Sequence, residues 1–406
     1  MLKRSGLNRN LAVLSVTIFV NLFLRFMWYP LLPLHLRALG ANEWEIGVSF
    51  TLIGIAQTLF SIFGGALADR YGRKWIIALP TFLMGPLYVA AALTTSWSVV
   101  VGMLASAFAL GALLWPAFVA LVAESAEEER VARAYSFTEA AVLTGAIAGP
   151  VVGAGLLAVL DIPTMILWSG IGLILTALLR VWGLREPSRR KVGSALPKLR
   201  AAIVTNVRWF IAMGSCITIA FSMSFGPYFA ILARDAWRNS EPEINLLFAA
   251  GNVAALIGIV LGRLSDRWGA RRVLMFAALG YGIGTIVWGL APTWQGGLLP
   301  LLIAFGFSEA MIIAQQTLQA EITSPETRSP VIGIIATTTG FVGGLGPTLG
   351  AWLITLGGNS MPFVAAGATG LIAMIAVTQV AGLKSQVTGQ ATSLKSQVTG
   401  QGSPET

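Results

Sequence analysis

The chain is poor in cysteine, histidine and charged residues. Its 406 residues include one cysteine, Cys216, and one histidine, His35, which excludes an internal disulfide, a cysteine metal cluster and a multi-histidine zinc or iron site. Charged residues make up 11% of the chain, less than half of the roughly 25% in a typical soluble protein. They could not cover a water-facing surface of this size, and a hydrophobic content of 55% excludes a disordered chain. The composition therefore indicates a membrane protein that crosses the bilayer several times.

Twelve long apolar segments run along the chain. A helix needs about 20 apolar residues to cross a hydrocarbon core about 30 Å thick, and twelve segments are long enough. They fall at residues 11–34, 45–67, 75–94, 98–123, 134–159, 163–184, 208–232, 244–264, 272–291, 297–320, 330–356 and 361–382. Such continuous runs differ from the short alternating segments of a membrane β-barrel. The sequence predicts an all-α membrane protein with twelve transmembrane helices.

Basic residues indicate the side of the membrane on which each loop lies. With both termini in the cytoplasm, Arg37, Arg234 and Arg238 lie outside and Arg25 lies in the membrane, so all other Lys and Arg residues are cytoplasmic. Cytoplasmic loops carry an excess of Lys and Arg. We therefore expect a multi-pass protein of the cell inner (plasma) membrane with both termini in the cytoplasm. The net charge of +9 then reflects topology, and we expect no nucleic-acid partner.

Two parts of the sequence recur at one offset. Residues 65–74, GALADRYGRK, return as residues 262–271, GRLSDRWGAR, and residues 149–153, GPVVG, return at the same offset as residues 346–350, GPTLG. Separate features that share one register indicate an internal repeat. The predicted organisation is an N-terminal six-helix half (1–184), a cytoplasmic linker (185–207), a C-terminal six-helix half (208–382) and a flexible tail (383–406).

The first of these loops carries a known pattern. Gly65, Asp69, Arg70, Gly72 and Arg73 resemble the signature loop of the major facilitator superfamily, and the resemblance covers about residues 10–382. It implies two pseudo-symmetric six-helix halves that rock around a central cavity. In that family the loop closes the cytoplasmic gate, which implies a set of gating residues: Asp69, Arg70, Arg73, Glu124, Arg133 and Asp266.

Two contacts of the gating residues are expected from their positions. Asp69 ends span two, where its carboxylate can face the N-terminus of span eleven near Ser329, and the helix dipole favours a carboxylate there. Glu124 ends span four and can pair with Arg73 or Arg133. Both contacts would help to hold the cytoplasmic side closed.

A run of small residues marks span five. Gly145, Gly149, Pro150 and Gly153 resemble the motif of the drug/proton antiporters within this family, and small residues at this spacing let helices approach closely. The resemblance implies proton-coupled efflux. Span four, however, has the residues 106–108, SAF, where these antiporters usually carry an arginine. This departure leaves a second substrate class open.

Three ionisable residues lie at membrane depth, where charge is costly and points to function. They are Arg25 in span one, Glu139 in span five and Glu309 in span ten, and the repeat places uncharged residues at all three equivalent positions. Spans one and ten line the central cavity in the family that the chain resembles. We expect Glu309, or else Glu139, to carry a coupled proton. Arg25 can bind an anionic group or pair with Glu139.

The remaining candidates for substrate contact are uncharged. Asn21 and Trp28 share a helix face with Arg25, because they lie four residues before it and three after it. Further candidates are Trp115 in span four, Tyr228 in span seven and Gln315 in span ten. Each of these side chains can instead be a packing residue.

The predicted function is secondary active transport by alternating access. Arg25, Glu139 and Glu309 together give a slightly negative cavity, which favours proton-coupled efflux of small amphipathic or cationic compounds, of the multidrug type. Two alternatives stay open: a transporter of a polar or anionic metabolite, sugar or lysolipid bound through Arg25, and a non-transporting membrane receptor on the same fold. No phosphate-binding loop or nucleophile–base pair appears in the sequence, so we expect no enzyme activity, cofactor or bound metal. The expected partners are the substrate, protons and the lipid bilayer, and the chain is expected to act as a monomer.

Overall fold

Helices make up nearly all of the computed structural model, which describes residues 8–126, 130–186, 205–323 and 328–380. Within these ranges the chain forms no β-strand. The first half contains α1 (Arg9–Phe26), the short 3₁₀ helix η2 (Tyr29–Leu31), α2 (Leu32–Ala38), α3 (Glu43–Tyr71), α4 (Arg73–Leu93), α5 (Trp97–Glu124), α6 (Val131–Leu156) and α7 (Ile162–Gly183). The second half contains α9 (Thr205–Ser224), α10 (Tyr228–Asp235), α11 (Glu241–Gly262), α12 (Ser265–Trp268), α13 (Ala270–Leu290), α14 (Trp294–Ile322), α15 (Arg328–Gly344), α16 (Gly346–Gly357) and α17 (Met361–Gln379).

These elements form twelve spans that are long and apolar enough to cross a membrane. Every end lies within four residues of the twelve segments expected from the sequence. The prediction of an all-α membrane protein with twelve transmembrane helices is confirmed. The agreement is close because backbone groups in lipid have no water to bond, so a long apolar run satisfies them by forming a helix.

The internal repeat extends to the irregular points of the backbone. Span one is interrupted by η2 at Pro30, and span seven is interrupted at the equivalent Pro227, where α10 begins. The two copies of the signature loop each turn at a glycine with positive φ, 93° at Gly72 and 84° at Gly269. Proline lacks the amide that a helix interior needs, and glycine adopts positive φ without strain. The two halves therefore bend at equivalent residues.

Each half packs its spans in the same order. In the first half α1 packs against α6 and α7, and α4 packs against α5 and α7. In the second half α9 packs against α15 and α17, and α13 packs against α14 and α17. The two pseudo-symmetric six-helix halves are thus confirmed. Most of the predicted linker and all of the predicted tail lie outside the described residues.

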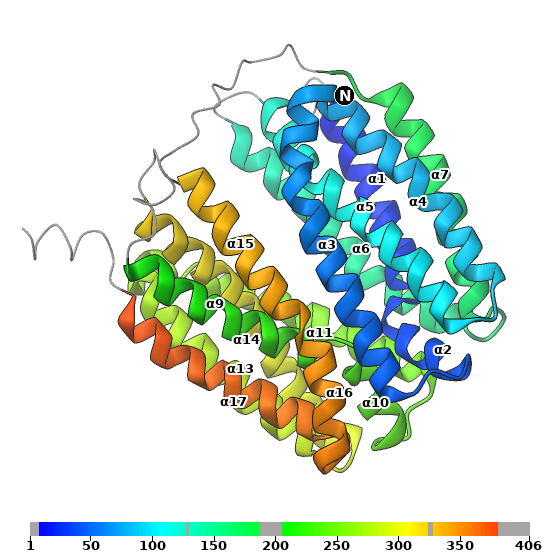
Figure 1. Ribbon diagram of the computed structural model, residues 1–406. Coiled ribbons are helices and arrows are strands. Elements are labelled where there is room, and N and C mark those ends of the chain that lie inside the picture. The colour runs from blue at the N-terminus through cyan, green and yellow to red at the C-terminus, as the bar shows by residue number, and fades with distance from the viewer. Residues whose placement is uncertain (1–7, 127–129, 187–204, 324–327, 381–406) are drawn as a thin grey trace, which may run out of the picture.

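The two halves meet at one end of the bundle. We call the end near Gly72 the linker end, because α7 finishes there, and we call the opposite end, near α2 and α10, the far end (Figure 1). Asn245 Nδ2 donates to the carbonyl oxygen of Met27 at 2.8 Å, and the hydroxyl oxygens of Thr51 and Thr348 lie 2.8 Å apart. In Figure 1, α3 and α15 lie close toward the far end and separate toward the linker end. The described arrangement is therefore joined at the far end and spread at the linker end.

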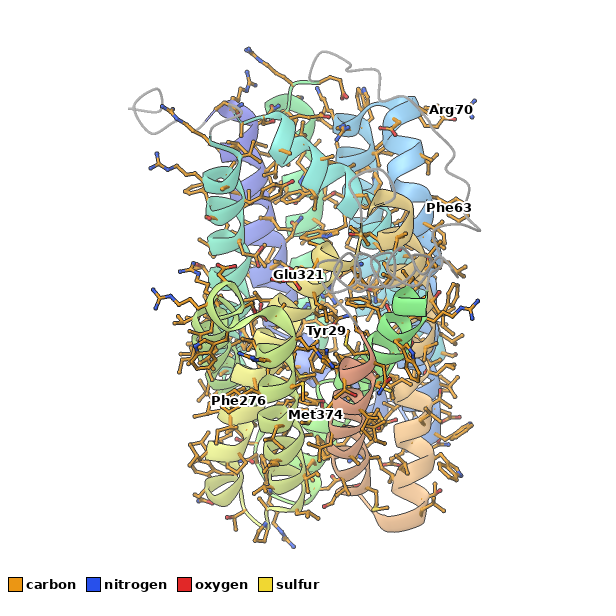
Figure 2. All side chains as sticks on the ribbon, turned by 90° about the vertical axis from the view of Figure 1, so that its left-hand side faces the viewer. Tyr29, Phe63, Arg70, Phe276, Glu321 and Met374 are labelled. Atoms are coloured by element: carbon orange, nitrogen blue, oxygen red, sulfur yellow. The ribbon has the colours of Figure 1, made fainter. Side chains whose placement is uncertain are left out.

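The outer surface of the bundle is apolar, as lipid contact requires. Phe63 on α3 is 57% exposed and Phe276 on α13 is 55% exposed, and both side chains stand on the outside of the helices (Figure 2). Tyr29, by contrast, lies in the interior at mid-height, and Arg70 lies at the linker end (Figure 2). Apolar side chains therefore cover both the core and the surface of this protein.

Candidate functional site

A cavity of about 360 Å³ lies inside the first half, between α1, α3, α4, α5 and α7. Its walls are mostly apolar and include Met84, Phe108, Leu114 and Trp115. Its polar lining residues are Asn21, Arg25, Gln57, Ser61, Tyr88, Ser169 and Arg180. Of the substrate contacts predicted from the sequence, Asn21, Arg25 and Trp115 thus line one cavity. A concave, mostly apolar pocket with a few polar groups is the usual form of a small-molecule site.

Arg25 is held in this cavity by aromatic rings. The carbon at the centre of its guanidinium group lies 4.3 Å from the ring centre of Phe108 and 4.5 Å from that of Tyr29. Both distances are within the range of a cation–π contact. Its Nε is buried and has no hydrogen-bond partner among the described residues. The alternative of an ion pair with Glu139 is wrong for the described arrangement, since no such pair forms there.

A second arginine, Arg180 on α7, lines the same cavity and was missed from the sequence. Its side chain is fully buried. Nε donates to the hydroxyl of Thr17 at 2.9 Å and Nη1 donates to the hydroxyl of Thr81, whereas Nη2 has no partner among the described residues. Its position near the end of span six made it look like a topology charge. The repeat places Val377 at the equivalent position, so the comparison that singled out Arg25 would also have singled out Arg180.

Two predicted substrate contacts are packing residues in the structure. Trp28 is fully buried, and its Nε1 donates to the hydroxyl of Ser169 at 2.8 Å. Tyr228 is 1% exposed, and its hydroxyl donates to the carbonyl oxygen of Pro347. Neither residue lines the cavity, so both predictions are corrected. The orientation of each helix about its own axis directs these two large side chains toward neighbouring helices and not into the cavity.

Gln315 lies away from the cavity as well. It belongs to α14 in the second half, where a Cβ added at Gly214 of α9 would lie 3.1 Å from its amide nitrogen. The side chain is partly buried between helices of that half. Gln315 therefore faces the second half and not the cavity of the first.

Glu139 and Glu309 lie at the boundary between the halves. Glu139 belongs to α6, which packs against α11, and Glu309 belongs to α14, where a Cβ added at Gly258 of α11 would lie 2.8 Å from its Cβ. The two carboxyl groups are close enough to interact electrostatically. Neither forms an ion pair among the described residues, and neither lines the cavity that holds Arg25. The three intramembrane charges predicted from the sequence therefore do not share one site.

The run of small residues on α6 packs against α1. Cβ atoms added at Gly145 and Gly149 would lie 3.0 Å and 2.6 Å from the carbonyl oxygens of Phe19 and Phe23. Gly153 is closer still to the backbone of α1, and Pro150 is buried in the same helix. Side chains larger than hydrogen do not fit at this spacing, so the glycines set how near the two helices come.

The predicted gating loop forms contacts within the first half. Arg73 Nη2 lies 2.6 Å from Glu124 Oε1 and 3.9 Å from Asp69 Oδ1. Glu124 thus pairs with Arg73, one of its two expected partners, and not with Arg133. The Asp69 side chain is 64% exposed. The expected partner of Asp69 near Ser329 involves a side chain outside the described residues.

The other predicted gating residues lie at the linker end without a contact across the halves in the described part of the chain. The guanidinium carbon of Arg70 lies 5.3 Å from the ring centre of Tyr71, and Arg133 and Asp266 are exposed. They are available for contacts that the spread arrangement does not make.

Glu186 is a further residue that the sequence reading missed. Its carboxylate oxygens accept hydrogen bonds from the backbone amides of Arg73 at 2.8 Å and Lys74 at 2.9 Å. These are the first two amides of α4, which have no partner inside the helix, and the positive end of the helix dipole favours a carboxylate there. The start of the linker is therefore tied to the signature loop.

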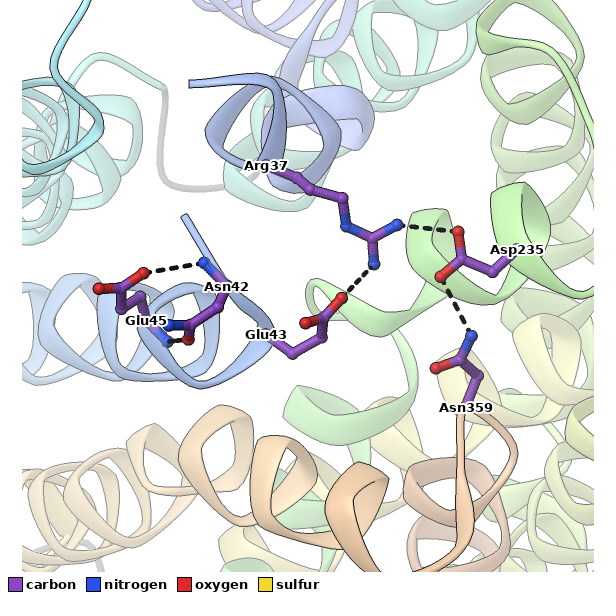
Figure 3. A network of polar contacts seen from close by, with 6 residues as sticks. All are labelled: Arg37, Asn42, Glu43, Glu45, Asp235 and Asn359. Atoms are coloured by element: carbon purple, nitrogen blue, oxygen red, sulfur yellow. Dashed lines mark hydrogen bonds and ion pairs between the residues drawn. The ribbon is translucent and has the colours of Figure 1, made fainter. Parts of the chain in front are cut away.

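The far end is closed by an ionic network that joins the halves (Figure 3). Arg37 on α2 pairs with Glu43 on α3 at 2.7 Å and with Asp235 on α10 at 2.8 Å. Asn359 Nδ2 donates to the other carboxylate oxygen of Asp235 at 3.1 Å. The sequence placed Arg37 only in an outer loop. The network depends on residues about 200 positions apart in the chain, which no local pattern connects.

The sequence profile of the family described as Major Facilitator Superfamily matches residues 14–233 and 211–392. The chain belongs to this family. The prediction made from the loop around Asp69 is confirmed, and the twelve spans and paired halves described above are those of a major facilitator protein.

Two relatives within the superfamily are a resistance protein and an efflux pump. The quinolone resistance protein NorA of Staphylococcus aureus (strain Mu50 / ATCC 700699) is 23% identical over 244 residues, which cover 58% of this chain and 62% of NorA. The multi-drug resistance efflux pump PmrA of Streptococcus pneumoniae serotype 4 is 28% identical over 269 residues, which cover 61% of this chain and 65% of PmrA. The chain thus matches less than two thirds of the length of these relatives. They confirm the likeness to the drug/proton antiporter group that the glycine run indicated.

Solved major facilitator structures share the fold at low identity. A bacterial homologue of the human lysosomal transporter Spinster, in an inward-facing and occupied conformation, gives a TM-score of 0.71 at 17% identity over 91% of this chain and 95% of that chain. A POT family transporter in complex with a thioalcohol-conjugated peptide gives 0.74 at 14% identity, again over 91% and 95%. At these identities the likeness shows the fold alone.

Proposed function

We propose that this protein is a secondary active transporter of the cell inner membrane that exports small amphipathic compounds by alternating access, in exchange for protons. The observation that carries the proposal is the mostly apolar cavity of about 360 Å³ in a chain whose halves are joined at one end and spread at the other. Transporters of this kind move two repeats against each other around a site near the middle of the membrane. The efflux relatives NorA and PmrA support the direction of transport.

The orientation that we propose places the linker end in the cytoplasm. Basic residues crowd the loops and segments of that end, which is the pattern of cytoplasmic loops. The spread arrangement then faces the cytoplasm, and the Arg37 network closes the outer side. An exporter loads its substrate in this state. The cavity lies within one chain, so we propose that the monomer is the working unit.

Glu139 and Glu309 are the proposed proton carriers. Two carboxylates that lie near each other repel, and one bound proton removes the repulsion. Because the two residues belong to different halves, a proton there favours contact between α6, α11 and α14, and its loss favours separation. The proposed proton site thus lies at the boundary that has to rearrange during transport.

Transport by everted membrane vesicles tests the proposal. A neutral amphipathic dye serves as the substrate, and an acidic vesicle interior supplies the driving force. We expect uptake that stops when nigericin collapses the pH gradient. Glu309→Gln should abolish uphill uptake and retain exchange of dye for dye, whereas Glu321→Gln, at the exposed end of α14, serves as the matched control. Dye binding without any uptake would instead support the membrane receptor.

A further inference from the structure

Among the described residues, the cavity of the first half is lined by two guanidinium groups and by no acidic side chain. Arg25 comes from α1 and Arg180 comes from α7, and no Asp or Glu is among the residues that line this cavity. The carboxyl groups of Glu139 and Glu309 lie at the boundary between the halves instead. The sequence predicted a slightly negative cavity, because that prediction did not count Arg180 and placed both carboxylates in the cavity. The cavity itself is positive.

Arg180 does not have a hydrogen-bond partner for each of its donor nitrogens among the described residues. Burying a guanidinium group costs several kcal/mol unless the charge is paired. Thr17 and Thr81 bond to Nε and Nη1, but both hydroxyls are neutral and leave the charge uncompensated. They also hold the plane of the group in one orientation. Nη2 remains without a partner among the described residues, so one donor nitrogen of a fully buried cation beside the cavity is left unpaired within that part of the chain.

Arg25 is prepared for the same kind of contact. The rings of Phe108 and Tyr29 lie within 4.3 Å and 4.5 Å of its guanidinium carbon. A ring over the face of a guanidinium group leaves the N–H donors at its edge free, and Nε has no partner among the described residues. Planar guanidinium groups with free edges match the oxygens of a carboxylate or phosphate.

The rest of the cavity defines the body of the ligand. Met84, Leu114 and Trp115 provide apolar surface, and Asn21, Gln57 and Ser61 provide neutral hydrogen-bonding groups. We propose that Arg25 and Arg180 make this cavity an anion subsite, and that the substrate is a compound with an apolar body and an acidic group. That the ligand is a transported substrate rests on the proposed function, but the anion subsite itself can be tested by binding alone.

The test compares ligands that differ in one charge. Purified full-length protein is titrated with 1-pyrenebutyrate, its carboxamide and 1-pyrenemethylamine, and binding is followed by energy transfer from tryptophan to pyrene. Charge-assisted hydrogen bonds inside proteins correspond to roughly tenfold to hundredfold in affinity. We therefore expect the carboxylate to bind at least about tenfold more tightly than the carboxamide. The amine should bind more weakly than either.

Substitutions assign the preference to the two arginines. Arg25→Gln and Arg180→Gln should each reduce the preference for the carboxylate and leave the affinity for the carboxamide nearly unchanged. Arg185→Gln is the matched control, because its side chain is exposed just beyond α7 and outside the cavity. If Arg180→Gln does not fold, Arg180→Lys retains the charge without the planar group and should give an intermediate preference. Equal affinity for carboxylate and carboxamide, or a preference that neither glutamine variant reduces, overturns the anion subsite.

The acidic group can belong to a soluble compound or to a lipid, and two further arms separate these sources. The titration is repeated in nanodiscs of phosphatidylcholine with and without phosphatidylglycerol. Competition by the anionic lipid supports the subsite with a lipid as its occupant, and no competition supports it with a soluble acid. The results also distinguish a failure of the proposed transport function from a failure of the proposed anion subsite. Carboxylate-selective binding without uptake in everted vesicles contradicts only the proposed function, and uptake of neutral dye without that selectivity contradicts only the subsite.

Discussion

Asp235→Asn should weaken the closure of the far end. The substitution removes the charge that pairs with Arg37 across the halves at 2.8 Å, while an asparagine oxygen can still accept from Asn359. The side chains of Arg37 and Asp235 are 28% and 34% exposed. A partly exposed pair of this kind contributes up to about 1 kcal/mol. The ratio of far-end-closed to far-end-open molecules should therefore fall by about twofold to fivefold.

The assay measures this ratio by the distance between two spin labels. In a Cys216→Ser background, which lacks other cysteines, labels are placed at Trp44 on α3 and Leu356 on α16. These side chains are 50% and 60% exposed and lie on different halves at the far end. Pulsed EPR then gives the population of short and long distances. Asp235→Asn should increase the population of the long distance.

Glu43→Gln is the matched control for this prediction. Glu43 pairs with the same arginine at 2.7 Å, but both residues belong to the first half. Its loss should leave the distance distribution nearly unchanged. The reasoning is refuted if Glu43→Gln and Asp235→Asn shift the distribution equally, or if neither shifts it, because the contact across the halves would then not hold the far end closed.

Three further predictions concern local contacts. Gly153→Ala should lower stability by about 1–3 kcal/mol, because a Cβ there meets the backbone carbonyl of Met27 just after α1. Gly155→Ala places its Cβ in open space and should be neutral. Thermal unfolding in detergent compares the two variants, and equal losses of stability would contradict the packing argument. Glu186→Ala should cost about 1 kcal/mol by removing the cap of α4, and an unchanged melting temperature would speak against that cap. Hydrogen bonds from Thr164 hold the pKa of Asp161 below its ordinary value of 3.8. The contribution of the Asp161 carboxylate to stability is therefore present above pH 3.8 and is lost as the pH falls through the lower pKa of the folded state. The unsubstituted protein should be more stable than Asp161→Ala by about 0.5–1 kcal/mol, and this difference should shrink below pH 3.8. A difference that stays constant with pH would contradict the prediction.

The sequence by itself determined the twelve spans, the repeat and the family. The length of an apolar run is a local property, and lipid allows a run of that length only one common structure, the helix. The bends at Pro30 and Gly72 recur at Pro227 and Gly269 because the same residue types were kept at equivalent positions. The pairing of Arg73 with Glu124 was also among the expected contacts.

Only the tertiary structure decided which side chains share a site. The buried hydrogen bonds of Arg180 to Thr17 and Thr81 became visible only in the packed structure. The hydrogen bond that makes Trp28 a packing residue became visible there too. In a soluble helix, the apolar face shows which side is buried. A helix in lipid is apolar toward its neighbours and toward the membrane alike, as the exposed Phe63 shows. Its rotation, and with it the partners of each polar residue, is therefore set by close packing between helices.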